Sequence, residues 1–175
     1  KSRLGRLIVE LDVVATADAV PGDGSFVQPV RVTGEVWVSG DRYVIDAPGL
    51  RGRSWETGIL PRRAARAALT FDDGSVVFAQ ARTAAESGGE VVEGWTSVGG
   101  EVRPLRTLRV EHAGSADAAT LVLEDEHGEH RIAAELPYVA PMPGQIGGRS
   151  YELRLGVARV RWNERAGSGF VEELE

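Results

Sequence analysis

Few side chains in this sequence are suited to nucleophilic or metal-dependent chemistry. There is no cysteine, which removes thiolate metal ligands and cysteine nucleophiles. His127 and His130 are three residues apart among acidic residues, but they fall on a predicted hairpin turn where such side chains diverge, so we expect a solvated acidic turn. His112 stands apart from them, and no Gly-x-Ser-x-Gly nucleophile elbow occurs. We therefore expect no metal site, and the chemistry considered below requires no cofactor.

The tryptophans are the best candidates for contacts with a small apolar ligand. A β-barrel of eight or more strands can hold one small ligand, and rigid aromatic walls suit an apolar one. Trp37 and Trp95 share the parity of neighbouring polar residues, which predicts that they line a mixed apolar and polar cavity. Their placement in the core or on the surface is the open alternative. The complete set is Trp37, Trp55, Trp95 and Trp162.

These side chains must be positioned by β-strands, because alternation of apolar and polar residues dominates the chain. Turn pairs such as Asp73-Gly74 and Gly99-Gly100 separate the strands. Consecutive hairpins predict an all-β, antiparallel meander of about ten strands, which we expect to close into a lipocalin-like β-barrel, with a β-sandwich as the alternative. We predict a single domain over residues 1–175. Its expected strands are 4–15, 30–38, 42–47, 66–72, 75–83, 90–97, 102–111, 119–124, 129–137, 151–163 and 168–173.

Three features depart from the simple hairpin pattern. The stretch 61–69 is compatible with a helix or a strand. The apolar parity reverses at Gly156, which predicts a β-bulge there. The stretches 47–61 and 138–150 are rich in glycine and proline and are expected to be long loops, a common place for lids and binding sites.

Composition and charge exclude several classes of protein. With 42% apolar and 26% charged residues, the chain is typical of a globular domain, and no apolar run approaches the ~20 residues of a membrane-spanning helix. The net charge of −6 argues against a nucleic-acid partner. For the cluster Arg62, Arg63 and Arg66 we favour a solvated turn or short helix over an anion site. We expect a cytoplasmic protein.

The segment GEVWVSGDRYVIDAPGLRGRSWETG, residues 34–58, carries a resemblance to a known family. It resembles the lipocalin-like superfamily of carotenoid 1,2-hydratases, tocopherol-cyclase-like proteins and decalin-forming Diels–Alderases, in which a strand runs into G-x-R-D-H-S-W-G. The hairpin at 73–74, the stretch 93–104 and the closing GSGFVE of 167–172 follow in the family's order, so the resemblance spans about residues 26–175. The matching loop residues are Gly49, Arg51, Ser54 and Trp55.

The sequence also departs from that signature. The family's Asp and His fall on Gly52 and Arg53, and its next Gly falls on Glu56. A proton transfer that depended on those two groups therefore does not carry over to this chain. Relatives are also about twice this long, with two packed barrels, so the resemblance implies that the chain corresponds to the later half.

The resemblance implies a barrel that binds a small apolar metabolite and cyclises or hydrates it, as in terpenoid or polyketide natural-product biosynthesis. An acid role for Glu56 or Glu172 requires that burial raise the pKa of the carboxyl. The alternatives are a non-catalytic carrier and a structural subunit. The expected partners are a small hydrophobic ligand and either a missing N-terminal barrel or a second copy in a homodimer. The predicted catalytic residues are Glu56, Glu172 and Arg53, and the predicted ligand contacts are Trp37, Arg51, Ser54, Trp55, Trp95 and Trp162.

Overall fold

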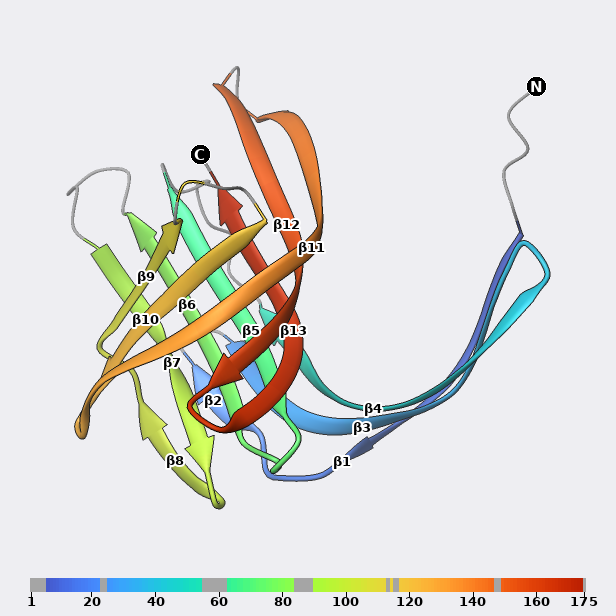
Figure 1. Ribbon diagram of the computed structural model, residues 1–175, viewed down its shortest axis with the longest axis horizontal. Helices are drawn as coiled ribbons and strands as arrows, with labels where there is room; N and C mark the ends of the chain where they lie inside the picture. The colour runs from blue at the N-terminus through green and yellow to red at the C-terminus, as the bar shows by residue number, and fades with distance from the viewer. Residues whose placement is uncertain are drawn as a thin grey trace. The chain divides into compact units, whose positions relative to one another are not determined.

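The computed structural model describes residues 6–22, 25–54, 63–83, 90–112, 114, 117–146 and 149–174. All regular structure in these ranges is β-strand, and every strand pair is antiparallel. The chain divides into two compact units, Lys1–Trp55 and Glu56–Glu175 (Figure 1). The predicted all-β antiparallel class is confirmed, whereas the single domain stays a prediction.

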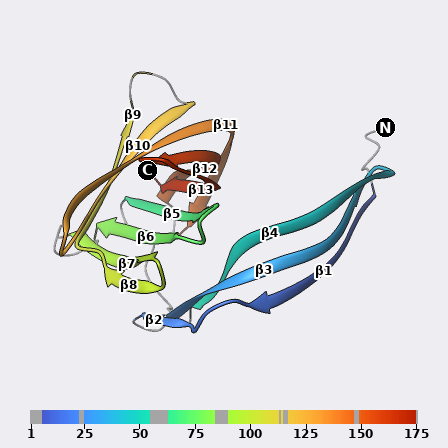
Figure 2. The same ribbon diagram turned by 60° about the horizontal axis from the view of Figure 1, so that its bottom comes forward.

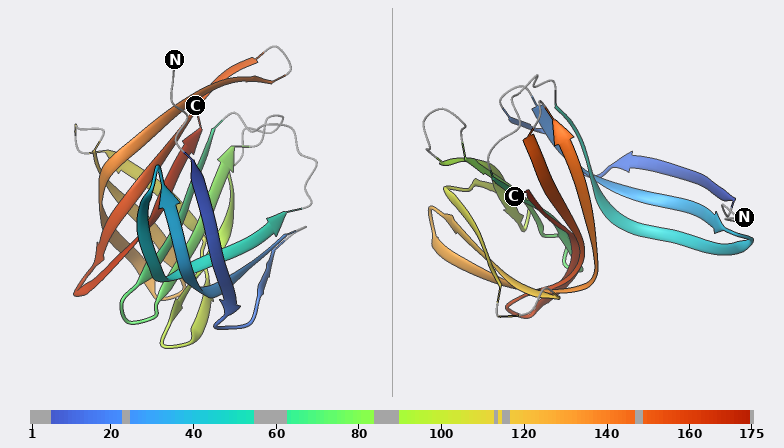
Figure 3. Two further views of the ribbon diagram at one scale, coloured as in Figure 1. Left: turned by 90° about the vertical axis from the view of Figure 1, so that its right-hand side faces the viewer. Right: turned by 90° about the horizontal axis from the view of Figure 1, so that it is seen from above.

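The described part of the second unit forms a nine-stranded sheet that curls into a half-barrel (Figures 1 and 3). The strand order is β8-β7-β6-β5-β13-β12-β11-β10-β9, so the C-terminal strand lies in the middle of the sheet, between β5 and β12. The strands are β5 (Ala64–Phe71), β6 (Val76–Thr83), β7 (Glu90–Val98), β8 (Glu101–Pro104), β9 (Thr107–His112), β10 (Ala118–Asp125), β11 (Gly128–Ile146), β12 (Arg149–Trp162) and β13 (Arg165–Leu174).

The concave side of this sheet is filled by large side chains at one end and lined by small ones at the other. Alternate residues of β5 point to the concave side, so Leu69 and Phe71 pack into the core while Ala65 leaves space. At the filled end, the Phe71 and Trp162 rings lie 5.7 Å apart. The buried core is Ala67, Leu69, Phe71, Val77, Ala79, Ala81, Leu105, Leu108, Ala119, Leu121, Leu123, Ile132, Ala134, Leu136, Ala158, Val160, Trp162 and Val171.

The structure settles the two ambiguous features of the central strands. Residues 64–71 are strand β5, and a helix is excluded there. The predicted bulge at Gly156 is wrong: β12 pairs with β13 without a register shift, and the shift falls on β11 between Glu135 and Tyr138. The parity reverses because Tyr151, Leu153 and Leu155 lie on the convex face, whereas Ala158, Val160 and Trp162 face the core.

The expectation of two long loops is also wrong for their described residues. Residues 41–54 form the single strand β4, and residues 133–146 pair with 149–161 as one long hairpin. Proline is accepted in these strands because sheets tolerate it at edges and at irregularities of pairing. The remainder of the first stretch, residues 55–61, lies outside the described residues.

The first unit is a sheet built around the long strand β3 (Ser25–Val38), as Figure 2 shows. One edge of β3 pairs with β1 (Leu7–Ala15) and β2 (Val20–Gly22), and the other pairs with β4 (Asp41–Ser54). Its more polar face carries the ion pairs Arg31–Asp46, at 2.7 Å, and Arg42–Glu35, alongside the exposed Val14 and Val44.

The opposite face of the first unit is apolar and poorly covered. The register places odd-numbered residues of β1 beside even-numbered residues of β3 and odd-numbered residues of β4. Six large apolar side chains on this face are between 40% and 64% exposed, which is unusual for a stable sheet surface. They are Leu7, Val9, Leu11, Val13, Val38 and Tyr43.

Candidate functional site

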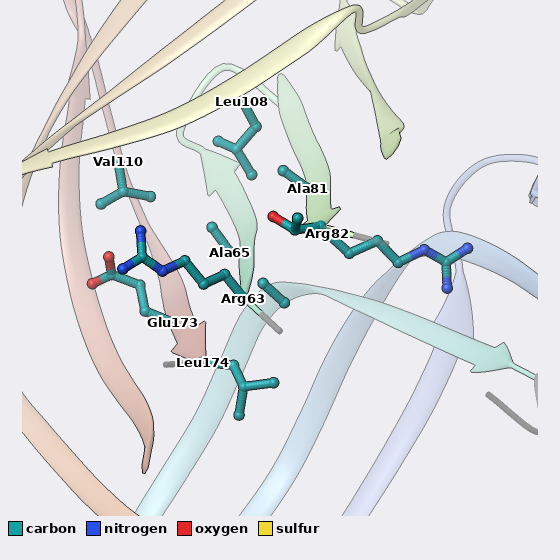
Figure 4. Close-up of a pocket in the computed structure, with 10 residues that line it drawn as sticks. Arg63, Ala65, Ala81, Arg82, Leu108, Val110, Glu173 and Leu174 are labelled. Carbon is teal, nitrogen blue, oxygen red and sulfur yellow. The ribbon is translucent and has the colours of Figure 1, made fainter. Parts of the chain in front are cut away.

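A cavity of about 220 Å³ opens at the alanine-lined end of the half-barrel (Figure 4). Its apolar lining comes from Ala65 on β5, Ala81 on β6, and Leu108 and Val110 on β9. The cavity exists because β5 and β6 place alanines here, whereas further along β5 the same face carries Leu69 and Phe71.

A carboxylate and an imidazole meet at the rim of this cavity. Glu173 shares the concave face of β13 with the core residue Val171, and His112 shares that of β9 with Leu108. His112 Nε2 lies 2.8 Å from Glu173 Oε2, within hydrogen-bond distance, and the two side chains are only 28% and 21% exposed. Glu173 itself lines the cavity.

Arg63 adds a positive charge to the lining of the cavity. Its side chain extends along the cavity wall, and its guanidinium lies on the same side as the Glu173 carboxylate (Figure 4). Arg82, the other arginine of the lining, points away in that view, and its guanidinium forms an ion pair with Glu93 at 2.9 Å. The rim therefore combines one imidazole, one carboxylate and one guanidinium around an apolar floor.

Such a pair can exchange protons with a bound molecule. Imidazole and carboxyl groups are the commonest general acids and bases, and hydrogen bonding between them fixes the orientation of both. The arrangement suits proton transfer to or from an apolar molecule whose reactive group reaches the rim.

The predicted acid Glu172 lies on the other face of β13, away from this cavity. Its Oε2 is 3.6 Å from Arg66 Nη1, and it lines a groove on the convex side of the sheet. Trp95 is also on the convex side, buried beside Phe78 with the ring centroids 6.5 Å apart. The catalytic role of Glu172 and the ligand role of Trp95 stay predictions.

The other predicted ligand residues are distributed over both units. Trp162 is packed in the core against Phe71 and does not line the 220 Å³ cavity. Trp37 lies on the polar face of the first unit and borders a hollow of about 280 Å³ with Ile8 and Glu10. The structure therefore brings Glu172 and Trp95 to one face of the second unit and places Trp162 on the opposite face.

The signature segment is only partly described. Arg51 donates hydrogen bonds from Nε and Nη2 to Gln28 Oε1, at 2.9 and 2.6 Å, across the β3–β4 pair. Arg53 lies opposite Phe26 in the same pair. The side chain of Ser54, and all of Trp55 and Glu56, lie outside the described residues, so their assigned roles stay predictions.

Sequence reasoning missed the Glu173–His112 pair, although a signal was present. The terminal strand alternates Gly167, Gly169, Val171 and Glu173 on one face, which places Glu173 with a core residue. His112 likewise follows Leu108 and Val110 in steps of two. If the alternating residues of both strands are taken to point into one shared interior, Glu173 and His112 are predicted to lie close together.

A second histidine–carboxylate pair lies at the filled end of the half-barrel. His127 is exposed, as expected for a solvated turn, but His130 and Asp125 point to the interior, with Asp125 Oδ2 and His130 Nε2 3.0 Å apart. The Asp125 side chain is 1% exposed, and its Oδ1 accepts a hydrogen bond from the His127 amide at 2.7 Å. Burial raises the pKa of Asp125, but the His127 amide and His130 outweigh burial and hold the pKa below its ordinary value.

No group of three or more His, Asp or Glu side chains in the described ranges is arranged to hold a metal ion. In the same ranges, no helix has the length and apolarity needed to cross a bilayer.

Comparison with solved structures identifies proteins of similar fold. A solved structure of a "putative AttH" from Nitrosomonas europaea matches with a TM-score of 0.58 at 14% sequence identity, over 97% of this chain and 59% of that protein. Kievitone hydratase from Nectria haematococca matches with a TM-score of 0.48 at 13% identity, over 93% of this chain and 57% of that one. This chain therefore spans less than two thirds of the length of either protein.

The similarity to the "putative AttH" confirms the fold that the loop and terminal motifs led us to expect. No curated protein matches the sequence significantly. A family profile matches residues 10–175, nearly the whole chain, and on that evidence the protein belongs to the DUF7064 family, a domain of unknown function.

Proposed function

We propose that this chain is the barrel half of a hydratase or cyclase that acts on a small, largely apolar metabolite of terpenoid or polyketide type. The observation that carries the proposal is the Glu173–His112 pair at the rim of a cavity lined by both apolar and charged side chains. The fold shared with the "putative AttH" supports the same class of protein. Glu173 and His112 act as the acid–base pair, and Ala65, Ala81, Leu108 and Val110 hold the hydrocarbon.

In a hydration, the protonated member of the pair gives its proton to one carbon of a double bond, and a C–H bond forms. Water adds to the cation left on the neighbouring carbon, and one proton of that water returns to the pair, which regenerates it. In a cyclisation, a second double bond of the same molecule attacks the cation in place of water, and the ring cation then returns a proton to the pair. Enclosure of a folded substrate contributes further, since orientation alone is worth about 7–11 kcal/mol in the best intramolecular cases.

The proposal is tested by conservative substitution of each member of the pair. Wild type, E173Q and H112Q are incubated with acyclic terpenes (myrcene, geraniol and farnesol), and products are followed by mass spectrometry. We expect each variant to lose about 10²–10⁴-fold in rate. The matched control is E111Q, which alters the neighbouring exposed carboxylate of β9, paired with Arg131 at 2.6 Å. Conversion by E173Q at the wild-type rate would show that the pair is not catalytic.

A non-catalytic carrier is the second candidate. It is favoured by Gly52 and Arg53, which stand where the related signature has its Asp and His. A carrier binds geraniol or farnesol with no product, and E173Q then changes affinity without any turnover to lose. Calorimetry combined with product analysis separates the two candidates.

We also propose that the apolar face of the first unit packs against further β-structure. Six large apolar side chains between 40% and 64% exposed, and a solved relative of which this chain spans 59%, support a second barrel as the occupant. Light scattering after size-exclusion tests this. Two results together would count against any occupant: the chain stays a soluble monomer, and its Leu11→Ser and Val13→Ser variants unfold at the same urea concentration as wild type. A dimer would instead identify a second copy of this chain as the occupant in place of the barrel.

A further inference from the structure

The convex face of the half-barrel carries a polar row beside an apolar row. Pairing across β13, β5 and β6 places Glu172, Arg66 and Gln80 directly opposite one another. The next row along the same strands is Phe170, Ala68 and Phe78. Side chains directly opposite in neighbouring strands are in contact distance, so the polar row is a continuous set of groups on one surface.

Aromatic rings hold Arg66 in place within this row. Its guanidinium carbon lies 5.3 Å from the centroid of the Phe78 ring and 5.7 Å from that of Phe170. Cation–π contact with two rings immobilises the guanidinium at little further entropic cost on binding. Ala68, between the two phenylalanines, is too small to displace it.

Within the part of the chain that the structure describes, the hydrogen-bonding capacity of Arg66 is largely unused. Its Nη1 is 3.6 Å from Glu172 Oε2, which is an ion pair but too long for a hydrogen bond. Its Nε is buried and has no hydrogen-bond partner among the described residues. The side chain is nevertheless 40% exposed, so a bound molecule can reach the guanidinium. Donors of Arg66 and acceptor oxygens of Glu172 thus stand side by side.

An apolar groove adjoins this donor–acceptor pair. The groove encloses about 290 Å³, and Tyr151, Leu153 and Leu174 form its apolar wall. Ala64 leaves the space open, because a larger residue at that position would fill it. Arg66, Gln80 and Glu172 close the polar end.

We infer that this groove is a second binding site, for a neutral, largely apolar molecule whose polar end carries a hydrogen-bond acceptor next to a donor, such as a primary amide. The acceptor oxygen takes hydrogen bonds from Arg66, and the donor gives one to Glu172. A carboxylate of the same size is disfavoured, because it accepts from Arg66 but brings a second negative charge against Glu172. This site lies on the opposite face of the sheet from the Glu173–His112 cavity, with Ala64 and Leu174 bordering both, and it does not depend on the proposed function.

The test compares two probes that differ only at the polar end, octanamide and octanoate, by calorimetry with the full chain at pH 7. We expect wild type to bind octanamide at least about 10-fold more tightly than octanoate. E172Q removes the charge with little change of shape, so it should weaken or reverse that preference. R66M should abolish binding of both probes. R109M, at an exposed arginine 3.5 Å from Glu129, is the matched control and should leave both affinities unchanged.

Equal affinity of wild type for the two probes, tighter binding of octanoate, or no binding of octanamide would each overturn the inference. If R66M does not fold, the wild-type preference and the E172Q response decide the question alone. E173Q distinguishes the two sites: it should leave octanamide binding unchanged, and a loss would mean that the probe occupies the concave cavity.

Discussion

Replacing Asp125 by alanine probes the buried pair that closes the filled end of the half-barrel. The substitution removes the acceptor of the His127 amide, at 2.7 Å, and the partner of His130, at 3.0 Å. The hydrogen bond from the His127 amide to a charged carboxylate is worth about 1.5–3 kcal/mol. Loss of the contact with His130 adds to this, so we expect a loss near the top of that range, about 3 kcal/mol.

For a chain of this size, such a loss lowers Tm by about 6–12 °C. The free energy of unfolding is measured by urea titration followed by circular dichroism, with hydrogen exchange at the β10–β11 hairpin to locate the effect. E126A, at an exposed carboxylate of the same turn, is the matched control and should change stability by less than about 0.5 kcal/mol. The double variant D125A/H130A should cost less than the two single losses added together. A loss below about 1 kcal/mol in D125A would refute the assignment of a buried, stabilising pair.

Three other predictions follow from the same geometry. The folded-state pKa of Asp125 lies below its unfolded value of about 3.9, so the contribution of this carboxylate to stability is complete above that pH and is lost as pH falls through the folded pKa. In urea titrations, D125N should therefore lose less stability than wild type between pH 5 and 3. A81F should fill the concave cavity and abolish geraniol binding by calorimetry, at a stability cost of about 1–3 kcal/mol; unchanged binding would place the ligand elsewhere. At Gly34, φ is +141° and an added Cβ would lie 2.1 Å from the Glu10 carbonyl oxygen, so in G34A the amides of β1 should exchange with solvent faster than in G40A. Gly40 is the control, because its φ is +106° and no atom lies within 4 Å of an added Cβ, and equal exchange in the two variants would contradict the prediction.

Most of the strand pattern was predictable because alternation reports directly on a sheet with one buried face. The pattern fails where both faces of a strand carry apolar side chains. On β12, Leu153 belongs to the convex groove and Val160 to the core, and this change of face imitates a bulge at Gly156. Gly156 has another role: a Cβ there would lie 3.1 Å from Leu136 Cδ2, on the strand that carries the actual register shift.

The candidate site was harder to predict because it depends on pairing between distant strands. His112 and Glu173 are 61 positions apart and on strands that are not neighbours in the sheet, so only the curl of the sheet brings them together. A terminal acidic residue was anticipated, but the choice between Glu172 and Glu173 is a choice between the convex and concave faces. That choice requires the register of β13 against β5.

Incorporation of solvent deuterium tests the acid–base role of the Glu173–His112 pair most directly. Wild type, E173Q and E111Q are incubated in deuterium oxide with myrcene, geraniol and farnesol, and the recovered substrates and products are examined by mass spectrometry. Hydration and cyclisation both begin with a proton delivered from the pair, so wild type and E111Q should place one deuterium on carbon and E173Q should not. Deuterium on carbon at the wild-type rate in E173Q, or none in wild type, would contradict the account.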